Sequence, residues 1–309
     1  TIQCGAVDMA AMGRALEILR GTLAGERLET LKRALLKMPD AQVPVPGMEG
    51  TVKDVIGTPY GPIVIGGPGR NVYRDVDAAV IVDVGGDDDY VYAKAEQRIG
   101  VFPVSMILDY EGDDLYQVSR VGGPGVGVLG IGLLLDLKGN DRYCQGLWPA
   151  FDPRKQTRDA LVEKDPEGVN TRIVPFVKLY GDPAKPDQPG VMLDSGFGFG
   201  AGFCGVGILV DERGDDLYLG QKYVFGAAMW HGVGLLQDGG GNDVYAAGVA
   251  SIGAGINGAF GALDDRAGND HYQCLGLHES GYSAGQEWDN GYEGSGIGFG
   301  SSWRAENRG

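Results

Sequence analysis

The sequence has no run of about 18 apolar residues, which excludes a hydrophobic helix that spans a membrane. Basic residues are also few: 26 Lys and Arg stand against 42 Asp and Glu, giving a net charge of −16. Nucleic acids and anionic membranes both require a basic surface, so neither is expected as a partner, and cations are the better expectation. No signal peptide precedes the body of the sequence, so a targeting segment was either removed or never present. The four cysteines are too few and too widely spaced for a disulfide framework, and they do not settle the compartment.

The sequence is rich instead in glycine and in one repeated motif. Glycine accounts for 55 of 309 residues, far above the ordinary share of about 7%, without the every-third-residue spacing of collagen. An apolar pair followed by Asp-x-x-Gly-[Asn/Asp]-Asp-x-Tyr occurs six times, and the tyrosines follow one another after 26, 27, 75, 27 and 27 residues. A fixed period in this range predicts a solenoid, in which each repeat forms one coil stacked on the next. The copies are Asp83–Tyr90, Asp109–Tyr116, Asp136–Tyr143, Asp211–Tyr218, Asp238–Tyr245 and Asp265–Tyr272.

The predicted fold is all-β: a right-handed parallel β-helix of about seven 26–27-residue coils with an N-terminal α-helical cap. Short β-rich runs separated by Gly-rich turns suit about three strands per coil. Within residues 1–50, apolar residues at helical spacing over 7–39 predict one or two helices that cap the first coil. Residues 51–309 are predicted to form the solenoid.

Two insertions are predicted at one corner of this solenoid. The 75-residue step exceeds one regular coil by 48 residues, and residues 147–193 are polar, charged and rich in proline. Residues 277–293 form a shorter insertion, after which the chain returns as a seventh coil. That coil stops at Gly309, before its aspartate, so we expect a fragment or processed piece of a longer protein, whose other pieces are candidate partners.

Two columns of aspartates follow from the period, because equivalent residues of stacked coils lie about 4.8 Å apart. Neighbouring carboxylates at that distance repel by roughly 3 kcal/mol per pair at an effective dielectric near 20. Raised pKa values, backbone N–H donors or bound cations can offset this repulsion. The first column is Asp83, Asp109, Asp136, Asp211, Asp238 and Asp265, and the second is Asp88, Asp114, Asp141, Asp216, Asp243 and Asp270.

The turn motif resembles the second half of the calcium-binding nonapeptide of RTX β-rolls, most closely at residues 240–245 (GGNDVY) and 267–272 (AGNDHY). This partial resemblance implies Ca²⁺ between successive turns, held by Asp carboxylates and main-chain carbonyls, and it nominates the second Asp of each turn. An oxygen-only ligand set agrees with Ca²⁺ rather than with zinc or copper. RTX repeats recur every nine residues, whereas here one turn recurs every 26 or 27.

A structural alternative accounts for the same residues. Each Asp can close its own turn by accepting nearby N–H groups, while the glycine takes a positive φ. The six tyrosines are predicted to stack as an interior ladder, with a sugar-stacking surface as the alternative.

A second candidate site uses cysteine and histidine. Counting back seven residues from each leading Asp places Cys204 and His231 on adjacent coils, with Asn257 beside the next position and Arg304 one coil later. A thiol beside an imidazole is how cysteine nucleophiles are activated. The segment 147–193 would then act as a lid over a hydrolase or transferase site.

The alternative for this pair is a place in the core. Residues two and four positions further on are apolar in each coil, so alternation predicts that Cys204 and His231 point inward among them. These apolar residues are Ile131, Val206, Val233 and Phe260, and then Leu133, Ile208, Leu235 and Ala262.

Two functional hypotheses result. The first is a secreted or cell-surface solenoid that binds calcium along its turns, has a structural role and presents its insertions to a carbohydrate or protein partner. The second is the Cys204–His231 enzyme.

Overall fold

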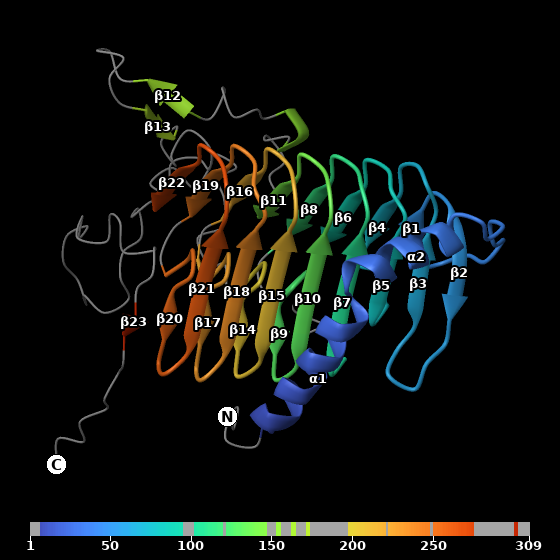
Figure 1. The fold of residues 1–309 in the computed structure, drawn as a ribbon, viewed down its shortest axis with the longest axis horizontal. Helices are drawn as coiled ribbons and strands as arrows, with labels where there is room; N and C mark the ends of the chain where they lie inside the picture. The colour runs from blue at the N-terminus through green and yellow to red at the C-terminus, as the bar shows by residue number, and fades with distance from the viewer. Residues whose placement is uncertain are drawn as a thin grey trace.

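The computed structural model describes residues 7–94, 102–119, 122–146, 153–155, 162–164, 171–173, 197–220, 222–247, 250–274 and 300–301. Three sheets, here named A, B and C, run along a stack of coils (Figure 1). Sheets A and B are parallel apart from the first pairing of each, and sheet C is parallel throughout, so the predicted parallel β-helix is confirmed.

The strands of each sheet follow one another in chain order. Sheet A contains β1 (Met48–Glu49), β4 (Val72–Arg74), β6 (Asp89–Tyr92), β8 (Leu115–Val118), β11 (Arg142–Gln145), β16 (Leu217–Leu219), β19 (Val244–Ala247) and β22 (His271–Cys274). Sheet B contains β2 (Val52–Ile56), β3 (Ile63–Gly66), β5 (Val80–Asp83), β7 (Val104–Asp109), β10 (Ile131–Asp136), β15 (Val206–Asp211), β18 (Val233–Asp238) and β21 (Phe260–Asp265). Sheet C contains β9 (Gly127–Val128), β14 (Gly202–Phe203), β17 (Ala228–Met229), β20 (Gly255–Ile256) and β23 (Gly300–Ser301).

The 75-residue step is a single coil with an insertion, as predicted. Strand β10 pairs with β15 so that Asp136 faces Asp211, and β11 pairs with β16 so that Tyr143 faces Tyr218. The rings of these two tyrosines stack with centroids 4.8 Å apart. Within the insertion, η3 (Pro153–Lys155) and the antiparallel pair β12 (Val162–Lys164) and β13 (Thr171–Ile173) are described. The predicted 277–293 insertion lies outside the described residues.

Tyrosines form the spine of the interior. Seven rings, one more than the six motif copies, stack in a continuous ladder from Tyr73 to Tyr272, with neighbouring centroids 4.5–5.0 Å apart. The extra ring belongs to Tyr73, in the coil that precedes the first copy of the motif. The predicted interior ladder is confirmed.

The interior is thin, and this corrects the predicted orientation of sheet B. A Cβ at Gly132 would lie 2.2 Å from the carbonyl oxygen of Val126, so only glycine fits there, and Gly207 and Gly234 are equally close to backbone. The fully buried Leu134 lies on the same face and belongs to the tyrosine core. The interior face therefore carries the glycines, and the alternating apolar residues beginning at Ile131 point to the outer face.

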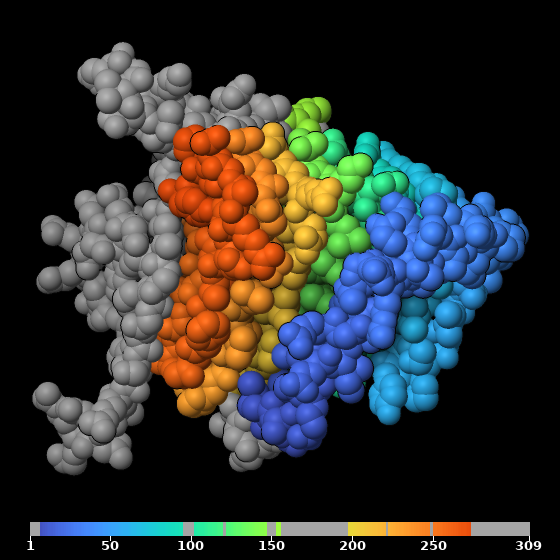
Figure 2. Space-filling model, viewed as in Figure 1, coloured from blue at the N-terminus to red at the C-terminus, as the bar shows by residue number. Residues whose placement is uncertain are grey.

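Two helices cover part of that outer face. Helix α1 (Met9–Thr22) begins at Asp8, whose side chain accepts the N–H of Ala11, and α2 (Gly25–Leu35) follows it. Leu28 and Leu35 pack against the outward side chains of sheet B, in a cluster with Ile65, Val82, Leu108, Tyr110 and Leu135. Figure 2 shows both helices lying across this face, while the strands of the C-terminal half remain visible beyond them. Neither described helix is both long and apolar enough to cross a membrane.

The first coil is covered by strands rather than by the predicted helices. Strand β1 pairs antiparallel with β4, and β2 pairs antiparallel with β3. Reversed strands occupy the edge that a parallel coil would otherwise leave open. The helices are N-terminal as predicted, but they lie on the side of the solenoid.

Candidate metal centre

The leading aspartate of each turn is held by two hydrogen bonds. Its Oδ1 accepts the backbone N–H two residues further on, for example Gly85 to Asp83 at 2.9 Å and Lys138 to Asp136 at 3.0 Å. From Asp83 to Asp238, its Oδ2 accepts a tyrosine hydroxyl from the preceding coil, as Tyr116 donates to Asp136 at 2.7 Å, whereas Asp265 accepts from Tyr272 of its own coil. The first bond is the turn-closing role of the structural alternative. The second bond was not anticipated from the sequence.

The second aspartate of each turn ties its coil to the preceding one. Its Oδ1 accepts the backbone N–H of the equivalent residue one coil earlier, as Asp114 accepts from Asp88 at 2.6 Å. This bond recurs from Asn71 to Asp270 with lengths of 2.6–2.9 Å. These six side chains therefore continue the backbone ladder around the corner between sheets B and A.

In five of these six aspartates, the other carboxylate oxygen has no hydrogen-bond donor among the described residues. The Oδ2 atoms of five second aspartates are buried without a partner among the described residues: Asp88, Asp114, Asp141, Asp216 and Asp243. Each of these side chains is 0% exposed. A buried carboxylate oxygen without a donor is costly, so a proton or a cation must occupy the space beside it.

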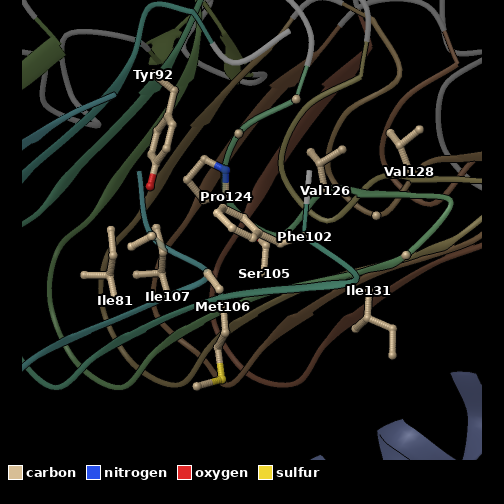
Figure 3. A pocket seen from close by; sticks show the side chains of 16 residues that line it. Ile81, Tyr92, Phe102, Ser105, Met106, Ile107, Pro124, Val126, Val128 and Ile131 are labelled. Carbon is tan, nitrogen blue, oxygen red and sulfur yellow. The ribbon is translucent and has the colours of Figure 1, made fainter. Parts of the chain in front are cut away.

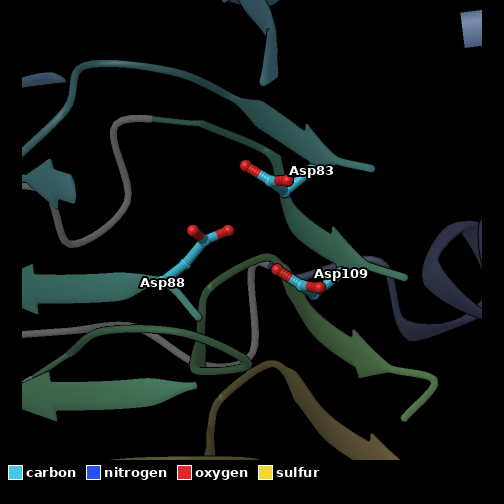
Figure 4. Close-up of side chains that lie close together, drawn as sticks. All are labelled: Asp83, Asp88 and Asp109. Atoms are coloured by element: carbon cyan, nitrogen blue, oxygen red, sulfur yellow. The ribbon is translucent and has the colours of Figure 1, made fainter. Parts of the chain in front are cut away.

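The carboxylates of these aspartates lie close to other carboxylates. In Figure 4, Asp88 faces Asp83 and Asp109, which stand on neighbouring strands of sheet B. One oxygen from each of the three lies within 4.8 Å of the others. Five triads occur among the described residues, of which the first two contain two leading aspartates and one second aspartate and the other three contain one leading and two second aspartates: Asp83/Asp88/Asp109, Asp109/Asp114/Asp136, Asp141/Asp211/Asp216, Asp216/Asp238/Asp243 and Asp243/Asp265/Asp270.

The electrostatics follow from burial. Loss of water raises the pKa of Asp114 to about 9, and the neighbouring Asp136 adds to the rise. Burial likewise raises the pKa of Asp88 to about 8 and that of Asp243 to about 8. The carboxyls of Asp88 and Asp83 are within hydrogen-bond reach of each other. Without a cation, these paired carboxyls share a proton at neutral pH.

Main-chain carbonyls lie beside the second aspartates. A Cβ at Gly112 would lie 1.7 Å from the carbonyl oxygen of Gly86 and 2.8 Å from Asp114 Oδ1. The turn glycines of later coils repeat this close approach, for example Gly139 with the carbonyl oxygen of Gly112 at 1.8 Å and Asp141 Oδ1 at 2.5 Å. Carboxylate and carbonyl oxygens together form the kind of ligand set that Ca²⁺ uses.

The first coil contains no aspartate at either position. Asn71 stands where later coils have the second Asp, and Gly66 stands where they have the leading one. Asn71 Oδ1 accepts the N–H of Thr51 at 2.6 Å, as the aspartates do one coil later. Its Nδ2 donates to Asp83 Oδ2 at 2.8 Å and to the carbonyl of Gly67 at 3.0 Å. An amide N–H therefore fills the place at which the aspartate coils have an oxygen without a donor.

The residue before each second aspartate points to solvent and forms a separate ladder. Asn140 donates to Asp113 through its backbone N–H at 2.9 Å and through its amide at 3.0 Å. Asp and Asn both occur in this outer ladder, which consists of Asp87, Asp113, Asn140, Asp215, Asn242 and Asn269. The outer ladder is exposed, so the candidate metal ligands are confined to the inner aspartates.

An arginine of the insertion docks beside the first triad. Arg154 in η3 forms an ion pair with Asp89 at 2.6 Å, and it donates to the carbonyl oxygens of Asp88 and of Asp113. Nothing in the spacing of the motif indicated this contact, because Arg154 lies in a segment without repeats.

A cavity elsewhere in the solenoid has different chemistry. It encloses about 70 Å³ and is lined by side chains such as Ile81, Tyr92, Phe102 and Ile107 (Figure 3). No residue described in its lining is charged. The polar candidate site is therefore the row of triads.

Cys204 and His231 of the predicted Cys–His site lie in different surroundings. Cys204 is buried and disulfide-bonded, so in this state it offers no thiolate. His231 is exposed at the corner before β18 and packs against Gly258, where an added Cβ would lie 2.9 Å from its Nδ1. Asn257 has a positive φ of 55° and a buried Oδ1. Arg304 lies outside the described residues.

Comparisons with protein-family models, with curated proteins and with solved structures each found no match. The description of this chain therefore comes from its fold and its site: it is a parallel β-solenoid with buried aspartate triads that could hold a metal ion.

Proposed function

We propose that this chain is a calcium-binding β-solenoid, in which Ca²⁺ ions lie between successive coils and fasten them together. The observation that carries the proposal is the set of five buried Oδ2 atoms without donors. Each of these five aspartates belongs to a group of three carboxylates, whose mutual repulsion costs about 3 kcal/mol per pair at an effective dielectric near 20. A divalent cation bound in the triad would neutralise this repulsion and be coordinated by the oxygens that lack a donor.

The ligand chemistry favours calcium over other ions. The candidate ligands are carboxylate and carbonyl oxygens, which excludes the soft metals that prefer sulfur and imidazole. Ca²⁺ accepts six to eight oxygens in irregular geometry, whereas Mg²⁺ retains several waters in a strict octahedron. The triads are sealed from solvent in four of five cases, so they suit the ion that dehydrates more readily.

The cellular role is part of the same proposal. A secreted or cell-surface solenoid would meet calcium concentrations that fill such sites, and the disulfide at Cys204 suits an oxidising compartment. The insertion at 147–193 would present a surface to a carbohydrate or protein partner. In support, Arg154 of this insertion forms an ion pair with Asp89, next to Asp88 of the first triad.

The experiment compares two substitutions that remove the same charge. Asp114→Asn removes a triad ligand, and Asp113→Asn alters the neighbouring outer ladder, in which Asn already occurs. Each protein is freed of metal with EDTA, dialysed against Ca²⁺ and measured for bound calcium and for its melting temperature. The wild type and Asp113→Asn should bind equally and gain many degrees, because a ligand of the folded state stabilises it. Asp114→Asn should bind one ion fewer.

Proton-filled triads would give a different result. If shared protons alone occupy the triads, added Ca²⁺ leaves the melting temperature of all three proteins unchanged. That outcome would overturn the calcium proposal and leave the aspartates as structural acid pairs. Among the described residues, nothing adds support to the hydrolase or transferase alternative.

A further inference from the structure

One acidic residue of sheet A has no acidic counterpart in the other parallel strands. Asp89 begins β6, and the residues in register with it along the stack are Val72, Leu115, Arg142, Leu217, Val244 and His271. The side chain of Asp89 is only 13% exposed, and a carboxylate so far withdrawn from water must be paired. The repeat does not require an acid at this position, so Asp89 marks a local site on the first copy of the motif.

Arg154 brings its guanidinium to three acceptors from two successive coils. Its Nε and Nη2 donate to Asp89 Oδ1 at 2.8 and 2.6 Å. Its Nη1 donates to the main-chain carbonyl of Asp113 at 2.9 Å, and its Nη2 also donates to that of Asp88. Arg70 pairs with the opposite oxygen, Asp89 Oδ2. A planar fork of N–H donors suits acceptors spread in this way, whereas a lysine presents its donors from a single nitrogen.

The acceptors and the arginine come from different parts of the chain. Asp88, Asp89 and Asp113 belong to the first two copies of the motif, whereas η3 follows β11 of the third copy. The side chain of Arg154 is 27% exposed, against 63% for Arg70, although both pair with the same carboxylate. The solenoid therefore supplies the acceptors, and the insertion supplies a closely held ligand for them.

We propose that Asp89 and the main-chain carbonyls of Asp88 and Asp113 form a receptor for one arginine side chain, which Arg154 fills as an internal ligand. The receptor selects a guanidinium because a planar group with several N–H donors meets all three acceptors at once. A ligand on a short tether acts at an effective concentration of about millimolar, so an arginine-bearing partner must displace Arg154 to use the site. None of these contacts uses a side-chain oxygen of the aspartate triads, so the inference does not depend on calcium.

The test removes the internal ligand and supplies it again as a peptide. Acetyl-Pro-Arg-Lys-amide, which copies η3, is titrated calorimetrically into the full chain in EDTA. Arg154→Ala should bind this peptide at least about ten times more tightly than the wild type, in which the tethered arginine competes. Acetyl-Pro-Lys-Lys-amide should bind Arg154→Ala at least about ten times more weakly. Adding Asp89→Asn to Arg154→Ala should abolish binding, whereas adding Asp87→Asn, which removes an exposed carboxylate of the same turn, should not.

A second measurement needs no peptide. Trypsin must take the side chain of Arg154 into its own pocket, so Asp89→Asn should speed cleavage after Arg154 by about tenfold, and Asp87→Asn should leave the rate unchanged. Melting temperatures establish that each variant is folded. Equal binding of the two peptides, or binding that persists without Asp89, would show only general attraction to an acidic chain and would overturn the receptor. Absence of peptide binding to Arg154→Ala would overturn it as well, and each of these results leaves the calcium proposal standing.

Discussion

Asp114→Asn should stabilise the metal-free protein at neutral pH, although it alters a buried, hydrogen-bonded residue. In the folded, metal-free chain the pKa of Asp114 is raised to about 9, against 3.8 ordinarily. Folding at pH 7 therefore requires the uptake of a proton at this side chain. That uptake costs about 1.4 kcal/mol for each pH unit above the unfolded pKa, or about 4 kcal/mol at pH 7.

An asparagine avoids this cost and keeps the geometry. Its Oδ1 can accept the N–H of Asp88 as Asn71 Oδ1 accepts that of Thr51, and its amide can donate where Asp114 Oδ2 has no donor. The variant should therefore gain up to about 4 kcal/mol in the free energy of unfolding at pH 7. The gain should vanish near pH 4, where the aspartate is protonated in both states.

Guanidinium unfolding in EDTA at pH 4.5 and pH 7 measures both values, with Asp113→Asn as the control of equal charge. Calcium should narrow the difference at pH 7. The wild type gains about 2.7 kcal/mol per site when free Ca²⁺ is a hundred times the dissociation constant, and the variant has one site fewer, so an advantage of about 4 kcal/mol should shrink to about 1.3 kcal/mol. A metal-free variant that is less stable than the wild type at pH 7 would refute the assignment of a protonated carboxyl at this position.

Three further outcomes follow from the same geometry. In EDTA, the unfolding free energy of the wild type should fall as pH rises from about 4 to about 9. Burial raises the pKa of Asp88 to about 8 and that of Asp114 to about 9, so the folded state holds protons that the unfolded chain has lost. A rise of the unfolding free energy over this range in guanidinium titrations would contradict this prediction. Tyr116→Phe removes a hydroxyl that donates to Asp136 at 2.7 Å and should cost about 1–3 kcal/mol by denaturant unfolding, while Tyr60→Phe, at a ring 72% exposed, should cost less than about 0.5 kcal/mol. Gly132→Ala places a Cβ 2.2 Å from the carbonyl of Val126 and should cost about 3 kcal/mol or more in thermal unfolding, whereas Gly57→Ala, which meets nothing within 4 Å, should have little effect; equal melting temperatures would contradict the thin interior.

The stacking of coils could be predicted because one physical constraint repeats. Parallel strands must align at a fixed spacing, so a motif that recurs every 26 or 27 residues specifies the register directly, as the pairing of Asp136 with Asp211 and Asp109 shows. The aspartate columns followed from that register. The seventh tyrosine, Tyr73, belongs to the same column in a turn whose aspartates are replaced.

The orientation of sheet B could not be predicted from alternation, because both of its faces are covered. Leu134 faces the tyrosines, and Leu135 faces α2 across the sheet. A strand buried on both sides has no polar face to mark the exterior. The glycines at 132, 207 and 234 held the missing signal, since a residue without a side chain marks the side on which backbones approach.

The details of the site depended on contacts between coils that the motif does not encode. From Asp83 to Asp238, the leading aspartate accepts from a tyrosine of the preceding coil, and the amide of Asn71 lies in a turn that departs from the motif. The disulfide at Cys204 was not anticipated either. The predicted pairing of Cys204 with His231 assumed a strict 27-residue register at their corner. The connections at this corner differ in length, because two residues separate β14 from β15 whereas three separate β17 from β18.

The unbroken stack of Tyr143 on Tyr218 has a consequence for how such a chain can change. The two coils stack directly on each other as if the intervening segment were absent, so the stacking does not depend on that segment. Its length and composition can vary at the modest entropic expense of closing a longer loop. Recognition of a new partner would then require the replacement of this one insertion, while the aspartates and tyrosines that join the coils stay unchanged.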